Sequence, residues 1–142
     1  MMWAKVTWRY EGLHHFPEMP AELDHVAFLG HEHRHEFHCT VWVEVKHDNR
    51  DIEYIDLKRA LKAEFGDNNM NHKSCEMVAR DIAEFVWGRH GSRPLKVEVL
   101  EDGENGALFE HNGQQKPHRE FSLEANQPTL EDYFGREEEV DF

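Results

Sequence analysis

The chain has 142 residues, a length that suits one domain with a short appendage. Its 16 Lys and Arg stand against 29 Asp and Glu, and the resulting formal net charge of −13 argues against direct binding to nucleic acid or to anionic membrane surfaces. No apolar run approaches the roughly 20 residues of a membrane-spanning helix, and the outlier in the composition is a set of 12 histidines.

The N-terminus and the two cysteines indicate a cellular compartment. Residues 1–8 read as a strand and lack the charged-then-apolar order of a signal peptide. Without a secretion signal, Cys39 and Cys75 are expected to be reduced. The sequence therefore predicts a cytoplasmic protein.

Charge and proline content divide the chain into two parts. Residues 1–111 hold 13 basic and 21 acidic side chains and show regular apolar patterns. Residues 112–142 hold 3 basic and 8 acidic side chains, with two prolines and little apolar periodicity. We expect a folded domain over 1–111 and an extended acidic tail over 112–142.

Within the domain, alternation of apolar and polar residues marks four strands, and helical spacing marks two helices. In chain order these are a strand over 2–10, a strand over 31–45, a helix over 56–65, a helix capped by Ser74 that ends near Gly88 or Gly91, and strands over 95–101 and 107–110 joined by a turn at 103–106. This order predicts an α+β domain, a four-stranded antiparallel sheet with both helices on one face (β-β-α-α-β-β).

The strand over 31–45 carries histidines where its inner face begins. That face starts with His31, His33 and His35 and continues with aromatic and aliphatic residues. Two imidazoles on one face of a strand suit two ligands of a catalytic zinc ion, which needs about three protein ligands. The third ligand is expected from the histidine pair at 14–15. The alternative is a solvated histidine-rich segment.

Five segments, in chain order, resemble motifs of the 6-pyruvoyl- and 6-carboxy-tetrahydropterin synthases. They are YEGLHHFP at 10–17, which resembles F-E-A-A-H-R-L-P; HRHEF at 33–37, which resembles H-G-H-x-aromatic; EYIDLK at 53–58, similar to D-F-A-E-L-K; SCE at 74–76, similar to T-S-E; and VEVLE at 97–101, similar to the strand that ends in the family's substrate-anchoring glutamate. The resemblance covers about residues 3–111. It implies the tunnelling fold, Zn²⁺ as cofactor, and trimers or hexamers with the pocket between subunits. The implied reaction is rearrangement or elimination on the side chain of 7,8-dihydroneopterin triphosphate.

The resemblance assigns the metal ligands. His14, His33 and His35 would bind the zinc ion. A rival register uses His31 and His33, but Phe37, two residues after His35, fits the family pattern better.

The resemblance also assigns residues to the substrate. Glu101 would accept two parallel hydrogen bonds from the guanidine-like edge of a pterin; otherwise it is a solvated turn residue. Ser74 and Glu76 would line the same pocket, although capping of the second helix explains Ser74 equally well.

The sequence departs from the family at its catalytic cysteine. That cysteine lies a few residues before the His-x-His pair, where this chain has Leu29, or Ala27 in the rival register. Neither side chain can take a proton. We expect Cys39 and Cys75 to be core residues instead.

A second departure concerns the Asp-His pair that follows the family's first helix. The matching segment keeps Asp67 but has Asn68 in place of the histidine, and an Asn cannot act as a general acid or base near neutral pH. Asp67, His31 and His72 are therefore the candidate proton-transfer groups, with His15 a further substitute.

Three functions are compatible with these departures. The chain runs the family reaction with substitute groups, or it catalyses another zinc-assisted step on a pterin or purine-like compound, or it binds such a compound without turnover.

The tail carries a short motif of its own. Residues 127–134, QPTLEDYF, resemble the peptide by which replication and repair proteins dock on DNA sliding clamps. A one-turn helix would place Leu130, Tyr133 and Phe134 on one side, and Gln127 would bond at the pocket rim. The alternative is a terminal helix that packs on its own domain or on a neighbouring subunit. Clamp docking gives a second class of function, a clamp-associated binding or accessory protein.

Overall fold

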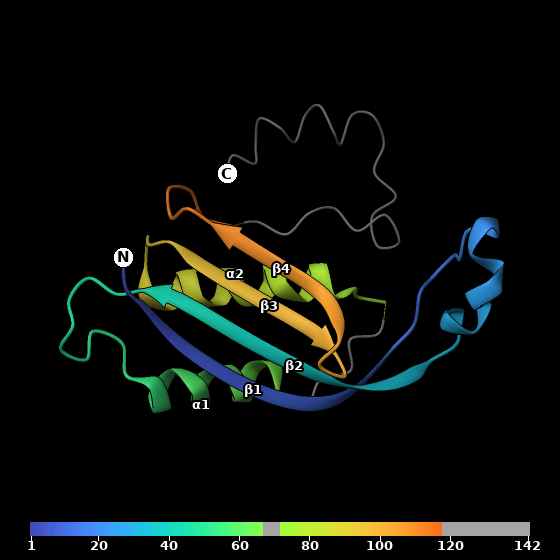
Figure 1. Cartoon of the computed structure of the whole chain (residues 1–142), viewed down its shortest axis with the longest axis horizontal. Helices are drawn as coiled ribbons and strands as arrows, with labels where there is room; N and C mark the ends of the chain where they lie inside the picture. The colour runs from blue at the N-terminus through green and yellow to red at the C-terminus, as the bar shows by residue number, and fades with distance from the viewer. Residues whose placement is uncertain (67–71, 118–142) are drawn as a thin grey trace.

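The fold, known from a computed structural model, is described for residues 1–66 and 72–117. Its elements are β1 (Trp3–His14), the 3-10 helix η1 (Ala21–Gly30), β2 (His33–Glu44), α1 (Tyr54–Phe65), α2 (Cys75–His90), β3 (Leu95–Glu101) and β4 (Asn105–His111). The four strands form one antiparallel sheet in the order β1-β2-β3-β4, with α1 along β1 and α2 behind β3 and β4 (Figure 1). The expected α+β class and the order of strands and helices are confirmed.

The core lies between one face of the sheet and the two helices. Alternate residues of each strand point to that face because side chains of a strand alternate between its two sides. The strand residues buried there are Ala4, Val6, Trp8 and Tyr10 of β1, Phe37, Cys39, Val41 and Val43 of β2, and Leu95, Val97 and Val99 of β3. The helices cover them with apolar side chains that recur at helical spacing, among them Leu57, Leu61, Val78, Ile82 and Val86.

Caps set the ends of both helices. The Glu53 carboxylate accepts hydrogen bonds from the backbone N–H groups of Ile55 and Asp56, so α1 begins at Tyr54, two residues earlier than expected. Ser74 caps α2 as expected, and its Oγ accepts from the Met77 N–H at 3.2 Å. The C-terminus of α2 is at Gly91, whose φ of 81° lies in the left-handed region that favours glycine.

Three local features differ from the sequence-based expectation. β1 continues to His14 instead of stopping at residue 10, because residues 11–14 pair with 33–36 of β2. The 3-10 helix η1 was not expected. None of its residues is buried, and its sequence therefore lacks the apolar periodicity by which a packed helix is predicted. The turn between β3 and β4 consists of residues 102–104 instead of 103–106, so it begins one residue earlier and ends two residues earlier than expected.

The C-terminal end of β1 and the N-terminal end of β2 extend beyond the core as a two-stranded ribbon. β2 pairs with β3 only from Phe37, which lies opposite Glu101, so residues 33–36 pair with β1 alone. In Figure 1 the chain leaves this ribbon to form η1, well away from the two helices. None of the described helices is long and apolar enough to cross a lipid bilayer.

Candidate metal centre

The period of the strands places four chemically active side chains on one face. His14 follows Tyr10 by four residues on β1, His33 and His35 precede Phe37 at two-residue steps on β2, and Glu101 follows Val99 on β3. All four therefore continue the helix-covered face just beyond the apolar core. The register pairs His14 directly with His33, and Phe37 with Glu101.

The three histidines converge on one another. One ring nitrogen of each of His14, His33 and His35 lies within 4.8 Å of the corresponding atom of the other two. The ring centroids are 4.6 Å apart for His14 and His33, 5.0 Å for His33 and His35, and 5.3 Å for His14 and His35. The structure thus brings His33 and His35, rather than His31 and His33, together with His14.

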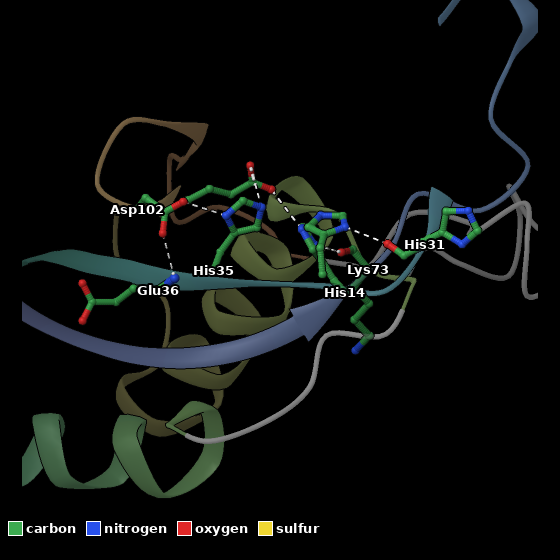
Figure 2. A network of polar contacts seen from close by, with 8 residues as sticks. His14, His31, His35, Glu36, Lys73 and Asp102 are labelled. Atoms are coloured by element: carbon green, nitrogen blue, oxygen red, sulfur yellow. Dashed lines mark hydrogen bonds and ion pairs between the residues drawn. The ribbon is translucent and has the colours of Figure 1, made fainter. Parts of the chain in front are cut away.

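The Nδ1 nitrogen of each of the three histidines lies close to an oxygen, as Figure 2 shows for His14 and His35. His14 Nδ1 lies 3.4 Å from the Lys73 carbonyl, His33 Nδ1 2.8 Å from the His31 carbonyl, and His35 Nδ1 2.7 Å from Asp102 Oδ2. Carbonyl and ionised carboxylate oxygens only accept, so each Nδ1 must carry the proton. In the neutral imidazoles the lone pair is then on Nε2, which is the form that binds a metal ion.

The Nε2 atoms of His14 and His35 lie against the carboxylate of Glu101. Glu101 Oε2 is 3.2 Å from His14 Nε2, and Oε1 is 3.7 Å from His35 Nε2. Both Nε2 atoms are buried and make no hydrogen bond. Lone pairs and carboxylate oxygens in such proximity repel unless a positive charge lies between them.

Protonation of the histidines is one source of that charge, and a metal ion is the other. Burial lowers the pKa of His14, an effect that the nearby Glu101 carboxylate opposes. His14 is only 7% exposed, which disfavours its charged form. Three neutral imidazoles beside a carboxylate are a donor set that suits Zn²⁺. The residues present therefore fit the expected ion.

A cavity of about 500 Å³ opens beside His14 and His33, two of the three histidines. It is lined by residues of β1, of the segment from β1 into η1, of β2, of the start of α2 with the residues before it, and of the β3–β4 hairpin. The expected site residues among them are His14, His15, His33, His72, Ser74, Glu76 and Glu101. The ends of β1 and β3, the starts of β2 and β4 and the N-terminus of α2 meet at this cavity. They bring together expected site residues up to 87 positions apart in the chain, from His14 to Glu101. The cavity has room for a heterocycle of pterin or purine size.

Other expected site residues are placed differently. His31 does not line the cavity; its carbonyl supports His33, and Figure 2 shows its ring turned away from the other imidazoles. Asp67 lies outside the described residues, as do Gln127, Leu130, Tyr133 and Phe134 of the tail motif.

The two cysteines are buried, as expected for core residues. Burial raises the pKa of both thiols, Cys39 and Cys75, to about 12, so neither is a thiolate at neutral pH. Cys75 also lines the cavity, which its place on the apolar stripe of α2 did not indicate. Leu29 contributes an apolar wall to the same cavity.

Sequence reasoning missed two residues that contact the histidines. Lys73 supplies the carbonyl that holds His14, while its ammonium group pairs with Asp81 at 2.7 Å. Asp102 holds His35. A lysine before a helix cap and an aspartate before a turn glycine both have ordinary local explanations, so only the fold shows their proximity to the histidines.

No protein-family model matches the sequence, and a search of curated proteins found no match. The resemblance to the tetrahydropterin synthases therefore stays a prediction that depends on the five motifs.

Proposed function

We propose that the chain is a zinc-dependent enzyme of the tetrahydropterin synthase type, a lyase that acts on 7,8-dihydroneopterin triphosphate or a related pterin or purine-like compound. The observation that supports this most is the set of three converging imidazoles, His14, His33 and His35, whose Nδ1 atoms are held by oxygens and of which His14 and His35 turn Nε2 toward Glu101. A cavity of about 500 Å³ adjoins them.

The three imidazoles would hold the ion, and Glu101 would anchor the ring. A zinc ion bound there would polarise a hydroxyl or carbonyl oxygen of the ligand's side chain and lower its pKa. The Glu101 carboxylate has two oxygens, which can accept parallel N–H bonds from a guanidine-like ring edge. Glu76 and the capping residue Ser74 line the cavity and help to shape it.

The proton-transfer groups of this proposal are histidines. His72 and His15 line the cavity, and an imidazole can give or take a proton near neutral pH. We favour His72, because it precedes the start of α2, where Ser74 and Glu76 also face the cavity. Asp67 remains a candidate for the relay.

Zinc analysis and turnover of dihydroneopterin triphosphate by the purified full-length protein test the proposal. We expect about one zinc per chain, loss of turnover on treatment with a chelator, and loss of both zinc and turnover in His33→Ala. His38→Ala is the matched control, since His38 lies on the same strand but outside the three-histidine cluster. A metal-free protein that is indifferent to chelators, or equal zinc contents in the two variants, would overturn the proposal.

Glu101→Gln separates ring anchoring from metal binding. The variant should keep its zinc and bind the pterin about 10- to 100-fold more weakly, because it loses a charge-assisted hydrogen bond. Loss of zinc in Glu101→Gln would instead make Glu101 a metal ligand. A wild-type protein that retains zinc and binds the pterin but shows no turnover would favour the non-catalytic alternative.

We further propose that the protein forms a trimer or hexamer in the cytoplasm. The strand order leaves β1 and β4 as the two edges of the sheet, and the free thiols Cys39 and Cys75 suit a reducing compartment. Light scattering coupled to size-exclusion chromatography measures the mass, and a monomer would exclude the assembly.

A second function, docking on a DNA sliding clamp, is favoured by the tail motif QPTLEDYF at 127–134. Pull-down of the full-length chain by a purified clamp should be abolished by Leu130→Ala or Phe134→Ala, which remove the apolar anchors. Glu131→Ala, which changes a residue of the same segment that is not one of its anchors Leu130, Tyr133 and Phe134 or the rim residue Gln127, is the control. Pull-down that survives both anchor changes would exclude docking through this peptide.

A further inference from the structure

We infer that Asp102 is a positioning residue of the metal centre: its carboxylate keeps the proton of His35 on Nδ1 and so presents the lone pair of Nε2 to the ion. This inference rests on the proposed function, because it assigns Asp102 a part in binding the same zinc ion.

Three contacts fix Asp102 against β2. Its Oδ2 lies 2.7 Å from His35 Nδ1, and its Oδ1 accepts a hydrogen bond from the Glu36 N–H at 2.9 Å. Its own backbone N–H donates to the Glu36 carbonyl at 2.6 Å. With both carboxylate oxygens and the main chain engaged by adjacent residues of one strand, the carboxylate has little freedom to leave His35.

The backbone of the turn is shaped to make these contacts. Asp102 has a φ of 56°, in the left-handed region that non-glycine residues rarely adopt. Gly103 follows with a φ of 73°, and a Cβ there would lie 3.2 Å from the ring of His38. The turn thus holds an unfavourable conformation that brings the carboxylate of the residue after Glu101 back onto β2.

Asp102 differs from the groups that hold the other two imidazoles. His14 and His33 are held by main-chain carbonyls, whereas His35 is held by a side-chain carboxylate. A carboxylate beside a ligating histidine fixes its tautomer and makes the ring a stronger donor to the metal. His35 is also the ligand whose tautomer a single side-chain substitution can change.

Asp102→Asn is the variant that isolates this role. The asparagine Oδ1 can still accept from the Glu36 N–H, but its Nδ2 is a donor and can meet only an unprotonated His35 Nδ1. The size and the turn are preserved while the proton of His35 is moved to Nε2. Asp56→Asn is the matched control, because Asp56 pairs with Arg89 and touches no histidine of the centre.

Two measurements on the full-length protein decide the matter. Two-bond ¹H–¹⁵N spectra of the metal-free protein should show His35 protonated on Nδ1 in the wild type and in the Asp56→Asn control, and protonated on Nε2 in Asp102→Asn. Competition with a chromogenic chelator should show zinc bound 10- to 100-fold more weakly by Asp102→Asn than by the wild type and by Asp56→Asn.

The outcomes distinguish this inference from the proposed function. Equal zinc affinities of Asp102→Asn and the wild type, or a wild-type His35 protonated on Nε2, would overturn the role of Asp102 while leaving the zinc centre intact. A wild type that binds no zinc would overturn the proposed function and this inference together, and would be recognised by the absence of any metal in the wild-type competition.

Discussion

The carboxylate of Asp51 lies 2.9 Å from the guanidinium group of Arg93, and this ion pair ties the segment after β2 to the segment before β3. Arg93 is only 8% exposed and also donates hydrogen bonds to the carbonyls of Glu44 and His90. Asp51 additionally accepts from the backbone N–H of Lys46 at 2.7 Å. The pair joins three segments of the chain at the opposite end of β2 and β3 from the cluster of His14, His33 and His35.

This pair predicts a loss of stability in acid. The hydrogen bond from the Lys46 N–H, followed by the hydrogen bond from Arg93, lowers the pKa of Asp51 in the folded state. The unfolded chain therefore binds a proton first as the pH falls, so the contribution of Asp51 is complete above its ordinary pKa of about 3.9 and is lost as the pH falls through the lower folded value. Urea unfolding at pH 7, 5, 4 and 3 measures it. The free energy of unfolding of Asp51→Asn should depend less steeply on pH below 5 than that of the wild type, and parallel curves would contradict this.

Truncation of Leu61 is expected to leave a cavity in the core and to lower the free energy of unfolding. Its side chain on α1 is fully buried, so Leu61→Ala should lower the free energy of unfolding by about 2–5 kcal/mol. Leu108→Ala removes the same atoms from a β4 side chain that is 53% exposed, and should change the stability by less than about 0.5 kcal/mol. Urea denaturation of both variants makes the comparison, and similar losses would show that Leu61 does not belong to the core.

Loss of the Ser74 hydroxyl, which caps the N-terminus of α2, is expected to lower the stability of the protein. Ser74→Ala leaves the Met77 N–H without its acceptor and should cost about 1 kcal/mol, whereas Ser74→Asp keeps an acceptor and should retain stability. Thermal or urea unfolding measures the capping role. Ligand affinity measured on the stable Ser74→Asp variant then tests the second role expected from the sequence: an unchanged affinity would make Ser74 a cap alone.

Gly106, in the wall of the cavity, is expected to tolerate no side chain. A Cβ there would lie 1.9 Å from the Val99 carbonyl oxygen and 2.7 Å from Leu100 Cα, both main-chain atoms of the adjacent strand. Gly106→Ala should therefore destabilise the protein and disturb the β3–β4 hairpin. Gly88 in α2 is the control, because a Cβ there meets nothing within 4 Å, and Gly88→Ala should stabilise by about 0.5–1 kcal/mol. Calorimetry should give shifts of opposite sign.

Much of the fold could be predicted from periodicity. The alternation in β2 and the apolar stripe of α2 each identify their element and the side that is buried, because both patterns are long and regular. The 3-10 helix η1 could not be predicted in this way, since it buries no residue. The extension of β1 to His14 was also missed, because residues 11–14 contain no apolar alternation and are held by pairing with β2.

The candidate site could be predicted in part. The spacing of His33 and His35 predicts two imidazoles on one face of a strand, whereas only the family resemblance assigned Glu101 to the same site. The structure places the Glu101 carboxylate 3.7 Å from His35 Nε2. The contact of Asp102 with His35 spans 67 residues and depends on a left-handed backbone conformation. Neither the register of the sheet nor that conformation follows from residue types in the chain, so Asp102 read as a turn residue.

The proposed metal site would also have a mechanical consequence, because it lies at the end of the two-stranded ribbon. His14 and His33 face each other across its last pair, where no third strand limits fraying. An ion held by both would crosslink the strands and penalise any slip in register, since a shift by one residue turns the ligands to the opposite side. Metal loading should therefore slow amide hydrogen exchange at Leu13 and Arg34 far more than in the middle of the sheet, because only two strands pair at this end.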